Sequence, residues 1–305
     1  EIDDGEYVAD LERYEGMLVT FDQQLFVTGN FLLARFGEVD LAAGGPLDNP
    51  TNVVAPGALA NAKQAENDLR RVVLDDGSNG SYPVPVPYVD PMAVGTLRTG
   101  DSVTGLTGIL GFGFGSYRLQ PVGDLQFDYV SRPATPPTVG GLVQVAAFNV
   151  LNYFTTLDTG SFICGPAGTE ECRGADTVSE LDRQRAKLVD AIGALEADVV
   201  GLIELENGAG DAPLQDLVDG LNAELGAGTY DFVATGNIGE DVIRVGLIYQ
   251  PAAVTPVGDF AVLDDSFDAG YRAELNRPAL AQTFAENGAG TSFTVVVNHF
   301  KSKGS

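Results

Sequence analysis

The sequence predicts a two-domain protein in which an all-β barrel precedes an α/β layered domain, and three observations support this. Residues 1–127 hold short β-type runs separated by turn signals, with one helical segment. Residues 128–141, DYVSRPATPPTVGG, are rich in proline and glycine and are typical of an extended linker. Residues 142–305 alternate helix-period segments with buried-type strands, which indicates an α/β fold.

The first domain is predicted to be a small closed barrel of the OB-like type. β-type runs occur at 16–21, 25–39, 70–80 and 101–121, and the segment 52–70 carries one short helix. About five strands and one helix in a domain of this size suit such a barrel. Phe112 and Phe114 would share one strand face under a period of two. We therefore expect them to fill the barrel interior, with base stacking as the alternative.

The second domain is predicted from a different pattern. Apolar strands are expected at 142–151, 199–207, 230–235, 242–251, 278–284 and 292–300. Helices are expected at 179–199, with Ser179 and Asp182 as a capping box, and at 213–225, with Pro213 in the first turn. Helices interleaved with buried strands predict sheets covered by helices.

The chain is strongly acidic. It has 43 acidic and 17 basic residues and a net charge of −26. Such a charge repels nucleic acid and anionic lipid in general, so an anionic substrate requires a local basic patch or bound cations. Segment 298–305 contains no acid and holds Lys301 and Lys303. A hydrated surface and adaptation to high salt are both open as explanations of the acidity.

The two cysteines give information about the cellular compartment of the protein. Cys164 and Cys172, in CGPAGTEEC, are close enough in sequence to close a small loop. A disulfide would place the protein outside the cell or in the periplasm; two free thiols in a cytosolic protein are the alternative. Because the chain has one histidine and two cysteines, it has too few such ligands for a typical four-ligand zinc site. No apolar run reaches the roughly 18 residues of a membrane span, and no signal peptide is evident, which suggests a processed chain.

Polar side chains stand at the ends of three predicted strands: Asn149, the pair Glu204 and Glu206, and His299. A carboxylate suits a hard divalent cation, an amide adds a neutral oxygen, and an imidazole donates a proton or a hydrogen bond. Period-two alternation would put Glu204 and Glu206 on one strand face. Each residue alone has a structural explanation: a turn former, a solvent-facing acid or a structural histidine. The spacing alone therefore leaves both a catalytic site and these structural explanations open.

These motifs are specific enough to resemble a family. VAAFNVLNYF, ADVVGLIELEN, VIRVGLIYQP, NRPALAQTF and VVNHFKSKGS follow the order of the endonuclease/exonuclease/phosphatase superfamily, which has the DNase I-like fold. ARFGEVDLA, VVLDDGSNG and the CGP…CRGAD loop are similar to bacterial extracellular nucleases of the ExeM type, in which an OB-like domain precedes the nuclease domain. The resemblance extends from about Gly16 to Ser305 and supports the disulfide.

The resemblance implies a four-layer α/β sandwich and a secreted, Mg²⁺-dependent hydrolase of DNA or RNA, with Mn²⁺ or Ca²⁺ as alternative ions. Asn149, Glu204 and His299 match catalytic positions, and Glu204 with Asn149 matches the metal site. Arg277 matches a residue that approaches the phosphate backbone, and Lys301 adds to that positive charge. Additional candidates are Glu206, beside the metal ligand, and Asp241, an acid near the histidine. No stable protein partner is indicated.

The sequence also departs from the family. The GDFN motif that positions the attacking water and the later DH motif are missing, and GDFA at 258–261 precedes His299 instead of following it. We therefore expect the nuclease domain to be incomplete in this chain, with weak metal binding and very slow DNA hydrolysis. A phosphatase or phospholipase of the same superfamily, and a non-catalytic secreted binding protein on a decayed nuclease scaffold, are the alternatives.

Overall fold

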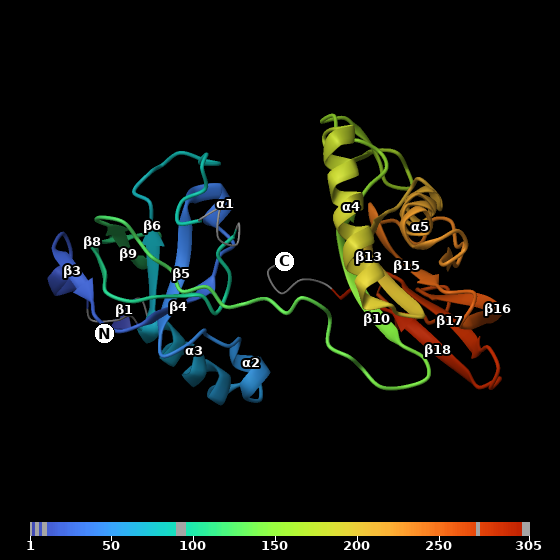
Figure 1. Cartoon of the computed structure of the whole chain (residues 1–305), viewed down its shortest axis with the longest axis horizontal. Helices are drawn as coiled ribbons and strands as arrows, with labels where there is room; N and C mark the ends of the chain where they lie inside the picture. The colour runs from blue at the N-terminus through green and yellow to red at the C-terminus, as the bar shows by residue number, and fades with distance from the viewer. Residues whose placement is uncertain (1, 4–5, 8–10, 90–95, 273–274, 301–305) are drawn as a thin grey trace. The chain divides into compact units, whose positions relative to one another are not determined.

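The computed structural model describes residues 2–3, 6–7, 11–89, 96–272 and 275–300. The chain divides into two compact units, Glu1–Arg132 and Pro133–Ser305, and Figure 1 shows both. The division falls within the proline-rich segment 128–141.

The first unit is built on one seven-stranded sheet with the strand order β3-β8-β9-β6-β5-β4-β7. Its strands are β3 (Leu18–Phe21), β4 (Leu25–Gly29), β5 (Glu38–Ala43), β6 (Arg71–Asp75), β7 (Ser102–Val103), β8 (Leu106–Gly113) and β9 (Ser116–Pro121). The unit also contains the short pair β1 (Ile2–Asp3) and β2 (Glu6–Tyr7), the 3₁₀ turn η1 (Glu12–Tyr14), and the helices α1 (Leu33–Phe36), α2 (Pro50–Val53) and α3 (Ala58–Arg70).

All neighbours in this sheet are antiparallel except β6 and β9, which are parallel. The inward side chains form an apolar core that includes Leu25, Val27, Leu41, Leu74, Leu106, Leu110 and Leu119. Within the part of the chain that the structure describes, the two outer strands β3 and β7 do not pair with each other. The closure that defines a barrel is therefore not seen, and the OB-like barrel stays a prediction.

The hairpin between β8 and β9 differs from the expectation for its aromatic residues. β8 ends at Gly113, and Phe114 lies in the turn with φ of 52°, followed by Gly115 at 74°. The Phe114 ring is 92% exposed and lies 4.9 Å from the Arg118 guanidinium carbon. Phe112, on the strand, packs edge-on against Tyr117 and is 42% exposed. The expectation that both rings fill the interior is wrong: a two-residue turn interrupts the alternation and leaves Phe114 outside, and Phe112 is also exposed.

The second unit contains a four-stranded sheet of order β10-β13-β15-β14, a three-stranded sheet of order β16-β17-β18, and a small pair, β11-β12. Its elements are β10 (Val145–Tyr153), β11 (Phe162–Cys164), β12 (Glu170–Glu171), α4 (Val178–Leu195), β13 (Val199–Glu206), α5 (Ala212–Leu225), β14 (Asp231–Phe232), β15 (Ile243–Tyr249), β16 (Val254–Leu263), β17 (Ala279–Glu286) and β18 (Ser292–Val297). GDFA, at 258–261, lies within β16, which the sequence did not predict as a strand.

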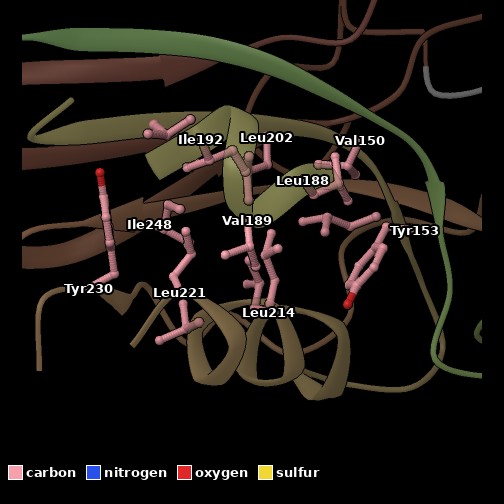
Figure 2. Close-up of a cluster of buried hydrophobic side chains, with 14 of the residues drawn as sticks. Val150, Tyr153, Leu188, Val189, Ile192, Leu202, Leu214, Leu221, Tyr230 and Ile248 are labelled. Atoms are coloured by element: carbon pink, nitrogen blue, oxygen red, sulfur yellow. The ribbon is translucent and has the colours of Figure 1, made fainter. Parts of the chain in front are cut away.

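These elements form three layers. The helices α4 and α5 cover one face of the four-stranded sheet through a continuous apolar core, shown in Figure 2, which includes Leu188, Ile192, Leu202, Leu214, Leu221 and Ile248. The opposite face packs on the three-stranded sheet through Val199, Val245, Leu247, Leu280, Phe284 and Val297. Among the described residues no helix covers the outer face of the three-stranded sheet, so three of the four predicted layers are present.

The ends of the two long helices follow from local chemistry. α4 begins after Thr177, whose hydroxyl accepts a hydrogen bond from the Glu180 N–H, while the Glu180 carboxylate accepts from the Asp176 N–H. The cap is thus two residues earlier than the expected Ser179. α5 carries Pro213 in its first turn, where a missing N–H has no cost.

Both sheets of the second unit have an unpaired edge on the same side. Within the described residues, β10 pairs only with β13, and β18 only with β17. Between these edges lies an open, mainly apolar cleft of about 450 Å³, lined along β10 by Val145 and Phe148 and along β18 by Val296. Val145 and Val296 are 51% and 52% exposed. Among the described residues of the second unit, no element therefore covers the space between the sheets at this edge.

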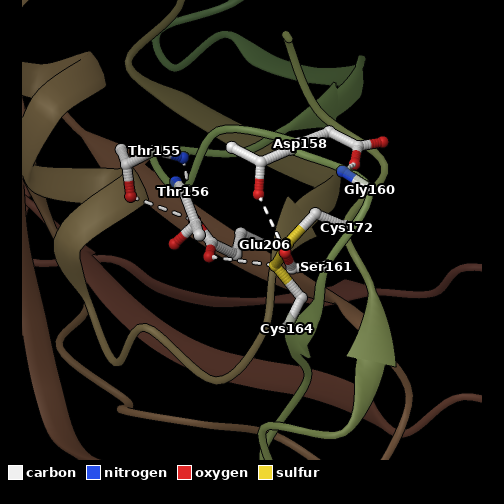
Figure 3. Close-up of a disulfide and its surroundings, with 9 residues drawn as sticks. Thr155, Thr156, Asp158, Gly160, Ser161, Cys164, Cys172 and Glu206 are labelled. Atoms are coloured by element: carbon white, nitrogen blue, oxygen red, sulfur yellow. Dashed lines mark hydrogen bonds between the residues drawn. A yellow bond between two sulfur atoms is a disulfide. The ribbon is translucent and has the colours of Figure 1, made fainter.

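The predicted disulfide is confirmed. Cys164 and Cys172 are bonded, both are buried, and they join β11 to the segment after β12 (Figure 3). No helix in the described parts of the chain is both long and apolar enough to cross a bilayer.

We expect the double variant Cys164→Ser, Cys172→Ser to lower the free energy of unfolding by roughly 2–3 kcal/mol, because the unfolded chain regains the entropy of an eight-residue separation. Urea unfolding without reductant measures the loss. Adding reductant to the wild type should reproduce it, and should leave the double variant unchanged. A wild type whose unfolding midpoint is insensitive to reductant would contradict this expectation.

Candidate functional site

Two parallel strands bring the first pair of predicted site residues together. β10 and β13 run side by side with Asn149 opposite Ile203, so Asn149 and Glu204 come to the same edge. The Asn149 Nδ2 donates a hydrogen bond of 2.8 Å to Glu204 Oε1, and the Asn149 Oδ1 accepts one of 2.8 Å from the Leu151 N–H. The amide is thus fixed in one orientation, with its nitrogen toward the carboxylate.

Both strands are distorted at this point. Leu151, Asn152 and Glu204 have φ values of 55°, 51° and 69°, which L-residues rarely adopt. The pairing register shifts between Asn149 and Tyr153 on β10 and between Leu202 and Leu205 on β13. Such bulges are over-represented next to active sites, because they re-aim a side chain out of the regular pleat. Glu204 is aimed at Asn149 in this way.

His299 reaches this edge from the other sheet. A Cβ on Gly201 of β13 would lie 2.9 Å from the Val297 side chain, so only glycine there allows the end of β18 to pack this closely. His299 follows two residues later, and its Nε2 lies 3.6 Å from Glu204 Oε1. The two side chains are 13% and 18% exposed. The structure therefore brings Asn149, Glu204 and His299 together.

A fourth and a fifth predicted residue lie beside them as an ion pair. The Arg277 Nε is 2.8 Å from Asp241 Oδ2. Asp241 precedes β15, and its main-chain oxygen accepts a hydrogen bond of 2.8 Å from Asn207 Nδ2. With Glu204 and Asp241 negative, Arg277 positive and the imidazole neutral, the group carries a formal charge of −1. The group is therefore compatible with a cation.

The imidazole is held neutral. Burial lowers the pKa of His299 below its usual value, the positive charge of Arg277 lowers it further, and Glu204 and Asp241 oppose the shift. The neutral ring has one N–H to donate. Its Nδ1 is buried and has no hydrogen-bond partner within the described residues. The Nε2 atom of the ring faces Glu204 and thus the polar groups of the site.

Glu206 belongs to a different environment. Its Oε2 accepts hydrogen bonds from the Thr155 N–H at 2.8 Å, the Thr155 hydroxyl at 3.0 Å and the Thr156 N–H at 3.1 Å (Figure 3). Its Oε1 lies 4.0 Å from the Cys164 sulfur, which is bonded to Cys172 and has no proton to donate. The expectation that Glu204 and Glu206 share one face is wrong, because the bulge at Glu204 interrupts the alternation.

Sequence analysis missed one residue that organises the site. Asn207 is fully buried directly after β13 and donates hydrogen bonds to the carbonyls of Ile238 and Asp241 at 2.8 Å, while its Oδ1 accepts from the Ile238 N–H. It thereby ties the end of β13 to the loop that carries Asp241. The only signal in the sequence is an asparagine that ends the apolar run GLIELEN. Lys301 and Lys303 lie outside the described residues.

The residues present fit a magnesium ion that keeps most of its water. Among the described residues no group of three His, Cys, Asp or Glu side chains is placed to hold a metal. Glu204 Oε1 accepts from Asn149, while Oε2 accepts no hydrogen bond from the residues that the structure describes. One carboxylate, with water and substrate phosphate as further ligands, is a donor set that Mg²⁺ commonly uses. Asn149 turns its nitrogen, not its oxygen, toward that carboxylate, so it positions Glu204 and is not placed as a second ligand.

No family model matches the sequence, and no curated protein is significantly similar to it. Several solved structures, three of which follow, are similar to part of the chain. The first, an endonuclease/exonuclease/phosphatase family protein from Bacteroides thetaiotaomicron, is 13% identical over 50% of this chain and 49% of its own, with a TM-score of 0.31. The second, the human Nocturnin catalytic domain with bound sulfate, is 16% identical over 53% and 51%, with a TM-score of 0.31.

The third is ANGEL2, described as a 2′,3′-cyclic phosphatase in complex with adenosine-2′,3′-vanadate, which is 12% identical over 53% of this chain and 42% of its own, with a TM-score of 0.34. The chain thus spans about half the length of the structures it matches. At these TM-scores the likeness assigns no function, so a functional proposal depends on the site itself.

Proposed function

We propose that the chain carries the active-site residues of a secreted, metal-dependent phosphodiesterase that hydrolyses DNA. One observation carries the proposal: an amide, a carboxylate and an imidazole from three distant segments, Asn149, Glu204 and His299, meet at one strand edge. Strained backbone in both strands at that edge and the ion pair of Arg277 with Asp241 beside it add to this support. The disulfide favours an oxidising compartment, and hence secretion.

Each side chain has a role that follows from its contacts. Glu204 would hold Mg²⁺ through Oε2, which accepts no hydrogen bond from the described residues, and the ion supplies positive charge to the phosphate oxygens when bound. Asn149 keeps the carboxylate oriented through its 2.8 Å hydrogen bond. Neutral His299 donates a hydrogen bond to a non-bridging phosphate oxygen. Arg277 offers its remaining guanidinium donors to the neighbouring phosphate, and Lys301 would add charge there.

The described residues leave the attacking water without an evident base. Asp241 is paired with Arg277, and Glu206 accepts hydrogen bonds from Thr155 and Thr156 away from the cluster. Glu204 is assigned to the ion. In-line attack on a phosphodiester requires an activated water in addition to charge stabilisation. We therefore expect slow hydrolysis by the 305-residue chain.

The proposal is tested first by metal binding. Mn²⁺, whose bound fraction is measured by electron paramagnetic resonance, is titrated into the wild type, Glu204→Gln and the surface control Asp190→Asn. About 0.15 M salt is present to screen the diffuse attraction of the acidic surface. We expect one site that is lost in Glu204→Gln and retained in Asp190→Asn. Equal binding by all three proteins would overturn the assignment of Glu204.

Substrate class is tested by incubating the chain for long periods with plasmid DNA, RNA, sphingomyelin and inositol phosphates in the presence of Mg²⁺. We expect DNA to be cleaved fastest, and RNA cleavage at a similar rate would widen the substrate to nucleic acid. Preference for sphingomyelin or an inositol phosphate would replace the nuclease by a phospholipase or phosphatase. A chain that binds Mn²⁺ but cleaves none of these substrates would leave only a binding protein.

A further inference from the structure

A polar cavity lies in the first unit, remote in sequence from the candidate site of the second unit. It has a volume of about 460 Å³ and opens between the C-terminal half of α3, the loop before α2, and the strands β4 and β5. Its charged lining consists of Asp40, Asp48, Asp68 and Arg71. Three acids against one base give a formal charge of −2.

A buried side chain without a partner borders this cavity. Asn67, on α3, is 4% exposed and is one of the lining residues. Its Nδ2 donates a hydrogen bond of 2.9 Å to the Asp48 main-chain oxygen, but its Oδ1 is buried and accepts none. An unmatched buried acceptor costs about 1–3 kcal/mol, and a cation or a donor placed beside it removes that cost.

The positive groups nearby are already engaged. Arg71 pairs with Asp40 at 3.0 Å and donates to the Ser116 hydroxyl at 2.7 Å. Arg70 donates to the Ala43 carbonyl at 2.6 Å and 2.9 Å and to Glu66 at 3.2 Å. Neither guanidinium is therefore directed to the Asn67 oxygen.

Local charge then favours a cation. Within the described residues, Asp48 and Asp68 form no ion pair, and Asp68 accepts a hydrogen bond only from the neutral Gln64 amide, at 2.7 Å. Asn67 and Asp68 lie in the last turn of α3, where the helix dipole is negative. The Thr28 hydroxyl, which accepts from the Leu47 N–H at 2.7 Å, holds the loop that carries Asp48 in place.

We propose that this cavity binds a calcium ion through the Asn67 Oδ1 and the carboxylates of Asp48 and Asp68, with water completing the coordination. Oxygen donors from carboxylates and an amide are the ligands of Ca²⁺, which accepts irregular geometry, whereas Mg²⁺ requires a near-octahedral set. Within the described residues no three acids converge on one point, so only two carboxylates contribute. A site of this low charge matches extracellular modules, which bind Ca²⁺ with Kd of roughly 10⁻⁴–10⁻³ M.

The ion would fasten the loop before α2 to the end of α3, and it is independent of the hydrolytic site. The test follows the side-chain amide signals of Asn67 by ¹⁵N NMR of the whole chain during a CaCl₂ titration to about 10 mM, which covers that range. Matched variants are Asp68→Asn, which keeps an oxygen for Gln64, and Asp124→Asn, an exposed acid of the same unit. Glu204→Gln serves to exclude the other candidate ion.

We expect the Asn67 signals to shift and saturate in the wild type, in Asp124→Asn and in Glu204→Gln, and Kd to rise about tenfold or more in Asp68→Asn. An unmoved Asn67 signal would mean that water alone fills the cavity. A shift that grows without saturation, that NaCl at equal ionic strength reproduces, or that Asp68→Asn leaves intact would also overturn the proposal.

Discussion

Glu204→Gln is expected to lower the rate of phosphodiester hydrolysis about a hundredfold or more and to leave the free energy of unfolding nearly unchanged. The substitution removes the negative charge that the proposed ion would require, and losses of this size follow the removal of one group that stabilises transition-state charge. Gln keeps an oxygen where Oε1 accepts the 2.8 Å hydrogen bond from Asn149, so the local structure is retained. Steady-state hydrolysis of plasmid DNA and urea unfolding measure the two effects.

Glu206→Gln is the matched control two residues away. Three hydrogen bonds from Thr155 and Thr156 end on this buried carboxylate, so the loss of its charge should lower the free energy of unfolding by roughly 1–3 kcal/mol. The folded variant should hydrolyse DNA at nearly the wild-type rate. If Glu206→Gln abolished hydrolysis with no change in stability, the roles of the two glutamates would be exchanged.

Arg244→Ala is expected to lower the free energy of unfolding of the second unit by about 3–5 kcal/mol, because it breaks a buried ion pair. Arg244 is 2% exposed on β15, and burial lowers its pKa. Its guanidinium lies 3.2 Å from Asp211 Oδ1 and donates to the Gly210 carbonyl at 2.8 Å and the Thr235 hydroxyl at 3.1 Å. Without it, these loops lose a shared donor and face a cavity.

The control is Arg183→Ala on α4. Arg183 lies 3.8 Å from Glu180, and the two side chains are 61% and 42% exposed. Exposed ion pairs contribute little, so this variant should stay within about 0.5 kcal/mol of the wild type. Urea unfolding followed by circular dichroism compares the two arginines. An equal loss of unfolding free energy in both variants would show that the buried ion pair contributes no more to stability than the exposed one.

The location of the site was predictable from the sequence because polar groups at the ends of apolar strands are costly unless they are used. Asn149, Glu204 and His299 stood out for that reason, and they meet at one edge. The separate environments of Glu204 and Glu206 were not predictable, since a bulge is a property of pairing between strands. Neither was the role of Asn207, whose partners Ile238 and Asp241 are distant in sequence.

The same division holds for the fold. Periodicity identified α4 and α5 because each buries one apolar stripe. It missed β16, because most residues of this strand are exposed and its register with β17 shifts between Val257 and Ala261. It misplaced Phe114 because a hairpin turn with positive φ is set by the two strands it joins. These features depend on how strands pair in the folded protein, which cannot be read from a single sequence.

In the part of the chain that the structure describes, β10 and β18 each have one unpaired edge, and these edges affect how copies of the chain associate. Free N–H and C=O groups on an extended strand are a template for another chain, and here they flank exposed valines. Electrostatic repulsion between copies that each carry −26 opposes such pairing in dilute buffer. That protection has a range of about 8 Å at physiological ionic strength, so the acidity keeps these edges apart mainly when little salt is present.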